Sequence, residues 1–281
     1  MMEKKQINIE RGFTHGGGFH ADDVFSSALL RILNPQIEIL RGNVVPEEFD
    51  GIVYDIGRGK FDHHQQQKLY RENGIPYAAF GLLWKEFGGL LLTDAEAEAF
   101  DKDFIQQMDL SDNTGEYHEL SQVISDFNPS WDEKTPLDER FLEAVDFAQT
   151  ILKNRIQKIL SKRKAQEEVT KIMDEQEGPV LVMDRFYPWK EVVCASDKLY
   201  VIFPSVRGGY MIQAVPKSAD TIELKKAFPV EWRGKTKEEL KEITGIESFT
   251  FCHMSGFICS ADRIEDAKKV AQLAERCEGT C

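Results

Sequence analysis

The chain has 281 residues, enough for two modest domains or one large one, each with its own hydrophobic core. Its 42% hydrophobic and 30% charged residues argue against wholesale disorder. The formal net charge of −13 speaks against a protein that coats long nucleic acids electrostatically. It still allows an enzyme that handles one chain end or a short oligonucleotide, because bound divalent cations would reverse the sign of the local field.

The sequence carries no signal for a membrane or for export. No apolar run approaches the roughly 18–20 residues that a membrane-spanning helix needs. The first residues lack the apolar stretch of a signal peptide and the Arg/Ser-rich character of a transit peptide. The five cysteines include no Cys-x-x-Cys pair. We therefore expect a cytoplasmic protein with reduced thiols and no membrane partner.

Strands and helices alternate along the first part of the chain. Apolar runs predict strands at residues 6–13, 37–40 and 51–56. Apolar residues at helical spacing predict helices at residues 22–33, 78–87 and 94–108. This alternation predicts an α/β fold, with a mostly parallel sheet flanked by helices in an N-terminal domain at residues 1–135.

The second part of the chain has a different texture. Residues 136–176 are charged and contain no glycine and no proline after Pro136, so they predict a connecting helix. Beyond Gly178-Pro179 the pattern predicts strands at residues 180–183, 199–203, 210–215 and 248–252, and helices at residues 236–244 and 263–277. We therefore expect a smaller α+β domain at residues 177–281.

Histidines and aspartates follow the predicted strands of the first domain. His15, His20 and Asp22 lie in and after a glycine-rich loop behind the first strand, and Asp55 ends the strand at residues 51–56. Because the C-terminal ends of parallel strands meet at one edge of a sheet, we expect these side chains to lie close together. Further donors follow at Asp62-His63-His64, Asp109 and Asp112.

Such a set of donors suits two-metal hydrolysis. Two divalent ions about 3.5–4 Å apart can activate a water molecule and neutralise the charge of a phosphoryl group. Mixed His/Asp ligation fits Mn²⁺, whereas Mg²⁺ prefers oxygen ligands. Single members have simpler explanations: three glycines at residues 16–18 make a flexible loop, and Asp22 can stabilise a helix N-terminus. The combination is more specific than any member.

Several segments of the chain resemble one protein family. They follow one another over nearly the whole chain, at residues 14–24, 61–65, 109–113, 127–131, 213–216, 231–234 and 253–258. With Asp55 placed before Asp62-His63-His64, the chain resembles the Myg-type (melanocyte-proliferating-gene-like) family of the DHH phosphoesterase superfamily. The resemblance implies a manganese-dependent phosphodiesterase, a 3′→5′ exonuclease acting on single-stranded RNA or short oligonucleotides.

The resemblance also implies roles for single residues. Two Mn²⁺ ions, or Mg²⁺ or another divalent ion in their place, would be held by His15, His20, Asp22, Asp55, His63 and Asp109. Asp55 would bridge the ions, and His64 would contact the substrate phosphate. In relatives the C-terminal domain grips the substrate beside the active-site cleft, which implies substrate-binding roles for Trp232, Arg233, His253 and Gly256. A guanidinium can bind phosphate by its planar fork, and an indole can stack on a base.

The sequence departs from the superfamily pattern in three places. His20 stands where Asp is common, although the Myg-type pattern has His there. Gln65-Gln66-Gln67 replace a basic residue, and Cys259-Ser260 follow where glycines are usual. The acidic charge and the glutamines leave open a small-molecule phosphohydrolase acting on pyrophosphate or on a cyclic or linear dinucleotide. A non-catalytic regulator that binds metal or nucleotide is a further alternative, and the oligomeric state stays open, a homodimer included.

Overall fold

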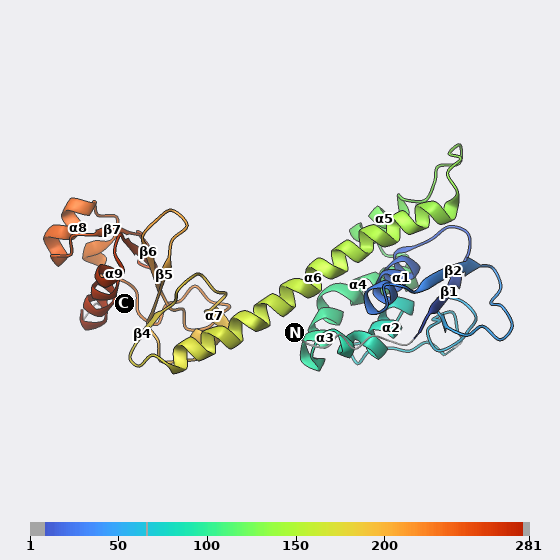
Figure 1. The fold of residues 1–281 in the computed structure, drawn as a ribbon, viewed down its shortest axis with the longest axis horizontal. Helices are drawn as coiled ribbons and strands as arrows, with labels where there is room; N and C mark the ends of the chain where they lie inside the picture. Colours follow the sequence, from blue (N-terminus) through green and yellow to red (C-terminus); the bar gives the residue numbers. More distant parts are fainter. Residues whose placement is uncertain (1–8, 66, 278–281) are drawn as a thin grey trace. The chain divides into compact units, whose positions relative to one another are not determined.

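The computed structural model describes residues 9–65 and 67–277, which form two compact units (Figure 1). The division falls between Leu160 and Ser161, inside the helix α6 (Leu137–Asp174). This helix corresponds to the long helix predicted at residues 136–176. As predicted, strands and helices are mixed and one of the sheets is parallel.

The first unit, Met1–Leu160, contains a three-stranded sheet in the order β2-β1-β3. The central strand β1 (Arg11–His15) pairs in parallel with β2 (Glu38–Gly42) and with β3 (Ile52–Val53). The predicted start of the first strand at Gln6 lies outside the described residues. The third strand is shorter than predicted because the chain turns at Asp55, whose φ of 54° does not fit a strand.

The helices of the first unit begin close to their predicted starts. They include α1 (Ala21–Leu33), α2 (Ala79–Phe87) and α3 (Asp94–Phe100). The third of these continues through a π-helical turn, η2 (Asp101–Ile105), into α4 (Gln106–Thr114), so the helix predicted at residues 94–108 is longer and less regular than expected. Two short helices, η1 (Gly88–Leu90) and α5 (Glu119–Ser125), come in addition to the predicted ones.

The core of the first unit surrounds α1, which is buried along most of its length. The N-terminal half of α6 packs against this core with Phe141, Ala144, Val145, Ala148 and Leu152, whose spacing of three and four residues makes one helix face. Close packing of this kind fixes the positions of the backbone around it. The start of α1 and the end of β1 are therefore held by the core.

The second unit, Ser161–Cys281, contains a five-stranded sheet in the order β4-β5-β6-β8-β7. Its strands are β4 (Val180–Val182), β5 (Tyr200–Pro204), β6 (Tyr210–Ala214), β7 (Phe249–Cys252) and β8 (Ile258–Ala261). Among the described strands of this sheet, only β4 and β5 pair in parallel, and β5 and β6 form the predicted hairpin. Strand β8 comes in addition to the predicted ones.

The helices of the second unit are α7 (Lys190–Val193), η3 (Val230–Trp232), α8 (Lys237–Thr244) and α9 (Ile264–Arg276). α8 and α9 match the predicted helices closely. Among the described helices, none has the length and apolar character to cross a membrane. Cys194, Cys252, Cys259 and Cys277 are free thiols, and Cys281 lies outside the described residues.

Aromatic side chains around Trp232 form the core of the second unit. Trp232 is only 3% exposed. Its ring stacks on that of Phe228 with 6.4 Å between centroids and meets the ring of Phe249 edge-on at 5.4 Å. Because these neighbours cover the indole, the expectation that Trp232 stacks on a substrate base is wrong, and Trp232 is a packing residue.

This burial predicts that replacing Trp232 destabilises the protein much more than replacing an exposed tryptophan does. Replacing Trp232 by alanine empties a core site and should lower the free energy of unfolding by about 3–5 kcal/mol. Trp131 is 97% exposed, and its replacement by alanine should change that energy by less than about 0.5 kcal/mol. Denaturant unfolding followed by circular dichroism measures both variants, and equal midpoints for the two would contradict the packing role.

Candidate metal centre

His15 and Asp55 meet because they end neighbouring parallel strands. His15 is the last residue of β1, and Asp55 follows β3 by two residues. The His15 Nε2 atom lies 3.3 Å from Asp55 Oδ2 and 3.3 Å from Asp23 Oδ2. The left-handed backbone of Asp55 costs about 1–3 kcal/mol and persists only where its surroundings hold it. Here the Asp55 N–H donates to the Phe61 carbonyl at 3.0 Å.

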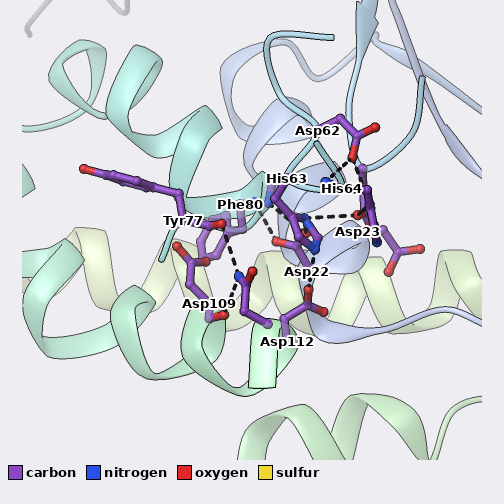
Figure 2. A network of polar contacts seen from close by, with 12 residues as sticks. Asp22, Asp23, Asp62, His63, His64, Tyr77, Phe80, Asp109 and Asp112 are labelled. Atoms are coloured by element: carbon purple, nitrogen blue, oxygen red, sulfur yellow. Dashed lines mark hydrogen bonds and ion pairs between the residues drawn. The ribbon is translucent and has the colours of Figure 1, made fainter. Parts of the chain in front are cut away.

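The first turn of α1 supplies two adjacent carboxylates (Figure 2). Asp23 Oδ1 accepts a hydrogen bond from the His20 N–H at 2.8 Å, which directs Oδ2 toward His15. Asp22 accepts hydrogen bonds from two backbone N–H groups at the start of α2, from Ala79 at 2.8 Å and from Phe80 at 2.6 Å. Both carboxylates are therefore held by backbone groups in defined orientations.

The two adjacent histidines of Asp62-His63-His64 differ in burial and in their partners. His63 is buried: its Nδ1 lies 3.5 Å from Asp55 Oδ1 and 3.6 Å from Asp22 Oδ2, and its Nε2 lies 3.0 Å from Asp112 Oδ2. The His64 side chain is 62% exposed, and its Nδ1 donates to Asp62 Oδ1 at 2.8 Å. His63 thus joins the buried carboxylates, whereas His64 stands at the surface beside them.

Within the described residues, three groups of donors lie close enough to bind one ion each, with all ligand atoms of a group within 4.8 Å of one another. They are His15-Asp23-Asp55, Asp22-His63-Asp112 and Asp55-Asp62-His63-His64. Asp23 Oδ2, Asp55 Oδ1 and His63 Nδ1 are buried without a hydrogen-bond partner. A buried polar atom without a partner costs about 1–3 kcal/mol. Each of these atoms belongs to one of the donor groups, and cations bound in the groups would satisfy them, so the residues fit a metal site.

The protonation equilibria reflect crowded negative charge. Burial raises the pKa of Asp22 well above its ordinary value, and the nearby Asp55 and Asp112 carboxylates raise it further. Burial also raises the pKa of Asp23 to about 7. Burial lowers the pKa of His15, but the Asp55 and Asp23 carboxylates outweigh it and raise this pKa to about 9. Positive charge is favoured here, in the form of protons or of a metal ion.

The structure brings together most of the predicted ligands. His15, Asp22, Asp55 and His63 converge, whereas His20 lies at the edge, exposed, with its ring centroid 5.6 Å from that of His15. Three further carboxylates, Asp23, Asp62 and Asp112, belong to the groups and were not assigned as ligands from the sequence. Their signals are their positions: Asp23 beside Asp22, Asp62 beside His63, and Asp112 a helical turn after Asp109.

Asp109 has a different partner from the one expected. Its Oδ2 accepts from Arg71 Nη2 at 2.8 Å, and the same guanidinium binds both carboxylate oxygens of Asp101 in the π-helical turn. Arg71 Nη1 also donates to the Pro76 carbonyl at 3.0 Å. These bonds hold the segment that leads into α2, and the first N–H groups of α2 in turn hold Asp22. Asp109 therefore binds Arg71 through Oδ2, its Oδ1 is buried without a hydrogen-bond partner, and Asp112 lies beside His63.

A cavity of about 480 Å³ opens on these donors. Its lining includes His15, Asp55 and Asp112 from the donor groups and the exposed ring of His64. Arg58 also lines it, and its N–H donates to Asp62 Oδ2 at 2.6 Å. The cavity has room for a substrate group next to the donors.

The predicted substrate-binding residues of the second unit share one loop region. Arg233 Nε and Nη2 donate to the Phe228 carbonyl at 3.0 and 2.8 Å. A Cβ atom on Gly256, whose φ is 65°, would lie 2.5 Å from Arg233 Nε, so only glycine lets the guanidinium approach. His253 Nδ1 accepts from the Ser255 N–H at 3.1 Å. Arg233, His253 and Gly256 are thus close neighbours, and Trp232 lies in the core beneath.

The model of one family, the uncharacterised protein family UPF0160 of MYG1 exonucleases, matches residues 12–274. The chain belongs to this family. Similar proteins include the MYG1 exonuclease of Bos taurus, at 28% identity over 94% of this chain and 84% of the relative. A MYG1 protein of Schizosaccharomyces pombe is 26% identical over 95% of this chain and 98% of the relative. A MYG1 protein of Chlamydia pneumoniae is 29% identical over 92% and 94%.

Gly81 gives a test of the support around Asp109 in this MYG1 family protein. A Cβ atom there would lie 2.6 Å from Arg71 Nη2 and closer still to Asp109 Oδ2. Gly81→Ala should therefore separate this ion pair, lower the free energy of unfolding by about 1–3 kcal/mol and weaken metal binding. Gly89→Ala is the control, because its new Cβ has its nearest neighbour, Asp94 Oδ1, at 3.6 Å. Denaturant unfolding and metal titration measure both, and two variants that behave alike would contradict the role given to this pair.

Proposed function

We propose that this protein is a divalent-metal-dependent exonuclease that hydrolyses single-stranded RNA or short oligonucleotides in the 3′→5′ direction, with Mn²⁺ as its metal. The observation that carries the proposal is the buried group of His and Asp donors at the carboxyl edge of the parallel sheet, with three of its atoms left without partners. The named activity of the mammalian relatives agrees with it.

We assign the ligands of two ions from the donor groups. His15, Asp23 and Asp55 would hold one ion, and Asp22, His63 and Asp112 the other, with Asp55 adjacent to both. His20, at the edge of the site, would be an additional ligand of the first ion. Such a mixture of imidazole and carboxylate suits Mn²⁺ better than Mg²⁺. When bound, the ions would neutralise phosphoryl charge and lower the pKa of water.

His64 is proposed to contact the scissile phosphate. Its Nδ1 donates to Asp62 Oδ1, which fixes the ring and leaves Nε2 for the substrate. Two N–H groups support Asp62 in turn, from Arg58 and from His64 itself. Burial would raise the pKa of Asp62, but these hydrogen bonds lower it below its ordinary value, so the carboxylate stays charged and holds the imidazole.

For the second unit we propose that Arg233, His253 and Gly256 bind a substrate phosphate. The planar guanidinium of Arg233 is held by the Phe228 carbonyl through two of its nitrogens, which orients the remaining N–H donors. Gly256 is part of this proposal because its missing side chain leaves the guanidinium accessible.

The first test is hydrolysis of an end-labelled single-stranded RNA ladder, with pyrophosphate and dinucleotides in parallel. We expect stepwise shortening of the RNA, loss of activity with a chelator, and recovery with Mn²⁺ exceeding that with Mg²⁺. Hydrolysis of the small substrates alone would favour a small-molecule phosphohydrolase. Tight Mn²⁺ binding without hydrolysis of any substrate would favour a regulator.

Two aspartates of α4 test the ligand assignment. Asp112→Asn should lower kcat and Mn²⁺ affinity by about 100-fold or more while leaving unfolding unchanged. Asp109→Asn should instead lower the free energy of unfolding by about 1.5–3 kcal/mol, because it weakens a charged hydrogen bond to Arg71. Titration calorimetry and denaturant unfolding separate the two effects. The reverse pattern would make Asp109 the ligand.

The raised pKa values predict proton release on metal binding. Below pH 7 both Asp23, with a pKa of about 7, and His15, with a pKa of about 9, carry protons that a metal ion must displace. Mn²⁺ affinity should therefore rise as the pH rises from 6 to 9, by up to about tenfold per pH unit for each proton displaced. Calorimetry in two buffers of different ionisation enthalpy counts the protons, and His15→Gln should release one fewer near pH 8. An affinity that stays flat over this range would contradict the assignment of His15.

A further inference from the structure

A second cavity, of about 360 Å³, adjoins the metal centre. It shares His20 and Asp112 with the cavity that opens on the donors. Its other walls come from the end of α4, from the turn at residues 115–118 and from α5. Its volume lies within the range of pockets that bind small molecules. A group bound here would lie beside Asp112, whose Oδ2 is 3.0 Å from His63 Nε2.

Hydrogen bonds fix the walls of this second cavity. The Ser111 hydroxyl donates to the Glu116 carbonyl at 2.7 Å, and Gly115 ends α4 in the left-handed conformation. His118 Nδ1 lies 2.9 Å from the Ser121 hydroxyl and accepts from the Ser121 N–H at 3.3 Å. The turn at residues 115–118, which joins α4 to α5, is therefore held in a defined conformation by hydrogen bonds.

The charge of the lining disfavours phosphate as a ligand. Among the described residues that line the second cavity, the acidic side chains are Asp112 and Glu116, and none is lysine or arginine. The basic side chains of the lining are His20 and His118, so it lacks the permanent cations that usually bind phosphate. The hydroxyl of Ser121 and the amide of Gln122 are suited to an uncharged polar group.

Tyr117 supplies an aromatic surface at the same cavity. Its side chain belongs to the lining and is 80% exposed, so no core neighbours cover its ring. Stacking of a base on such a ring contributes about 1–3 kcal/mol and is insensitive to the base. An exposed ring beside uncharged polar groups is a combination that fits a nucleoside.

We propose that this second cavity is a nucleoside subsite. It receives the terminal nucleoside of a substrate whose scissile phosphate lies at the metal centre, and Tyr117 stacks on its base. The Glu116 carboxylate, which is not one of the assigned metal ligands, selects a free terminal hydroxyl and repels a terminal phosphate. This inference rests on the proposed nuclease function and adds the chemistry of the chain end that the enzyme accepts.

The test uses one labelled RNA with a hydroxyl or a phosphate at each end. We expect hydroxyl-ended substrate to be hydrolysed at least about tenfold faster at the end where attack begins, a difference of about 1.4 kcal/mol. Tyr117→Ala should raise KM about tenfold through the lost stack, with Mn²⁺ affinity unchanged. Trp131→Ala, which removes an exposed aromatic that lines neither cavity, should leave KM unchanged.

A charge reversal sharpens the test. Glu116 uses its backbone, not its carboxylate, in the hydrogen bonds of the turn, so Glu116→Lys should fold normally. This variant should raise the relative rate on the phosphate-ended RNA several-fold, and added salt should reduce the gain. Glu98→Lys changes the net charge equally from an exposed position on α3 and should have no such effect.

Binding of adenosine keeps this proposal separate from the proposed function. Calorimetry or nuclear magnetic resonance with adenosine and Mn²⁺ should detect binding to the unaltered protein and its loss in Tyr117→Ala. If the protein hydrolyses no RNA yet binds adenosine through Tyr117, the nuclease proposal fails and the subsite stands. If RNA is shortened without any preference for the terminal group and Tyr117→Ala keeps its KM, the subsite is wrong and the nuclease proposal stands.

Discussion

Buried negative charge at the edge of the parallel sheet is the constraint on which the first unit depends. Asp22, Asp23 and Asp55 are each at most 4% exposed, and among the described residues none forms an ion pair with lysine or arginine. Ionised groups without compensation are expensive to bury. Protons offset this charge at low pH, as the raised pKa values indicate. A pair of divalent cations would offset it at neutral pH. Metal binding would therefore also stabilise the folded structure at this edge of the sheet.

The centre is held from a distance by a chain of contacts. Asp22 is oriented by the first N–H groups of α2, and the segment before α2 is held by Arg71. Arg71 is in turn fixed by Asp109 and by Asp101, which lies in the π-helical turn η2. Irregular turns of this kind are frequent near functional sites because they reorient side chains within a helix. Asp101 in this turn and Asp109 beyond it bind the same guanidinium.

Much of this arrangement follows from the sequence, and the rest depends on contacts between distant residues. Helical periodicity gave the starts of α1, α2 and α3, and strand order with donor position gave the meeting of His15 and Asp55. The choice between Asp109 and Asp112 was beyond such reasoning, because both lie on α4, one turn apart. The ion pair of Asp109 with Arg71, 38 residues earlier in the chain, is the contact that favours Asp112 in the proposed assignment. Trp232 was misjudged for the same reason: its burial depends on Phe228 and Phe249, which no local pattern reveals.

The net negative charge of the whole chain is compatible with the proposed function. A protein with a net charge of −13 gains little from counterion release along a polyanion, so long-range attraction cannot supply its affinity. In the proposed function, affinity would come from short-range contacts at one chain end: cations at the scissile phosphate and a stacked base beside it. Both act over a single nucleotide. The net negative charge of the chain disfavours binding along the interior of long nucleic acids, which suits the proposed action from an end.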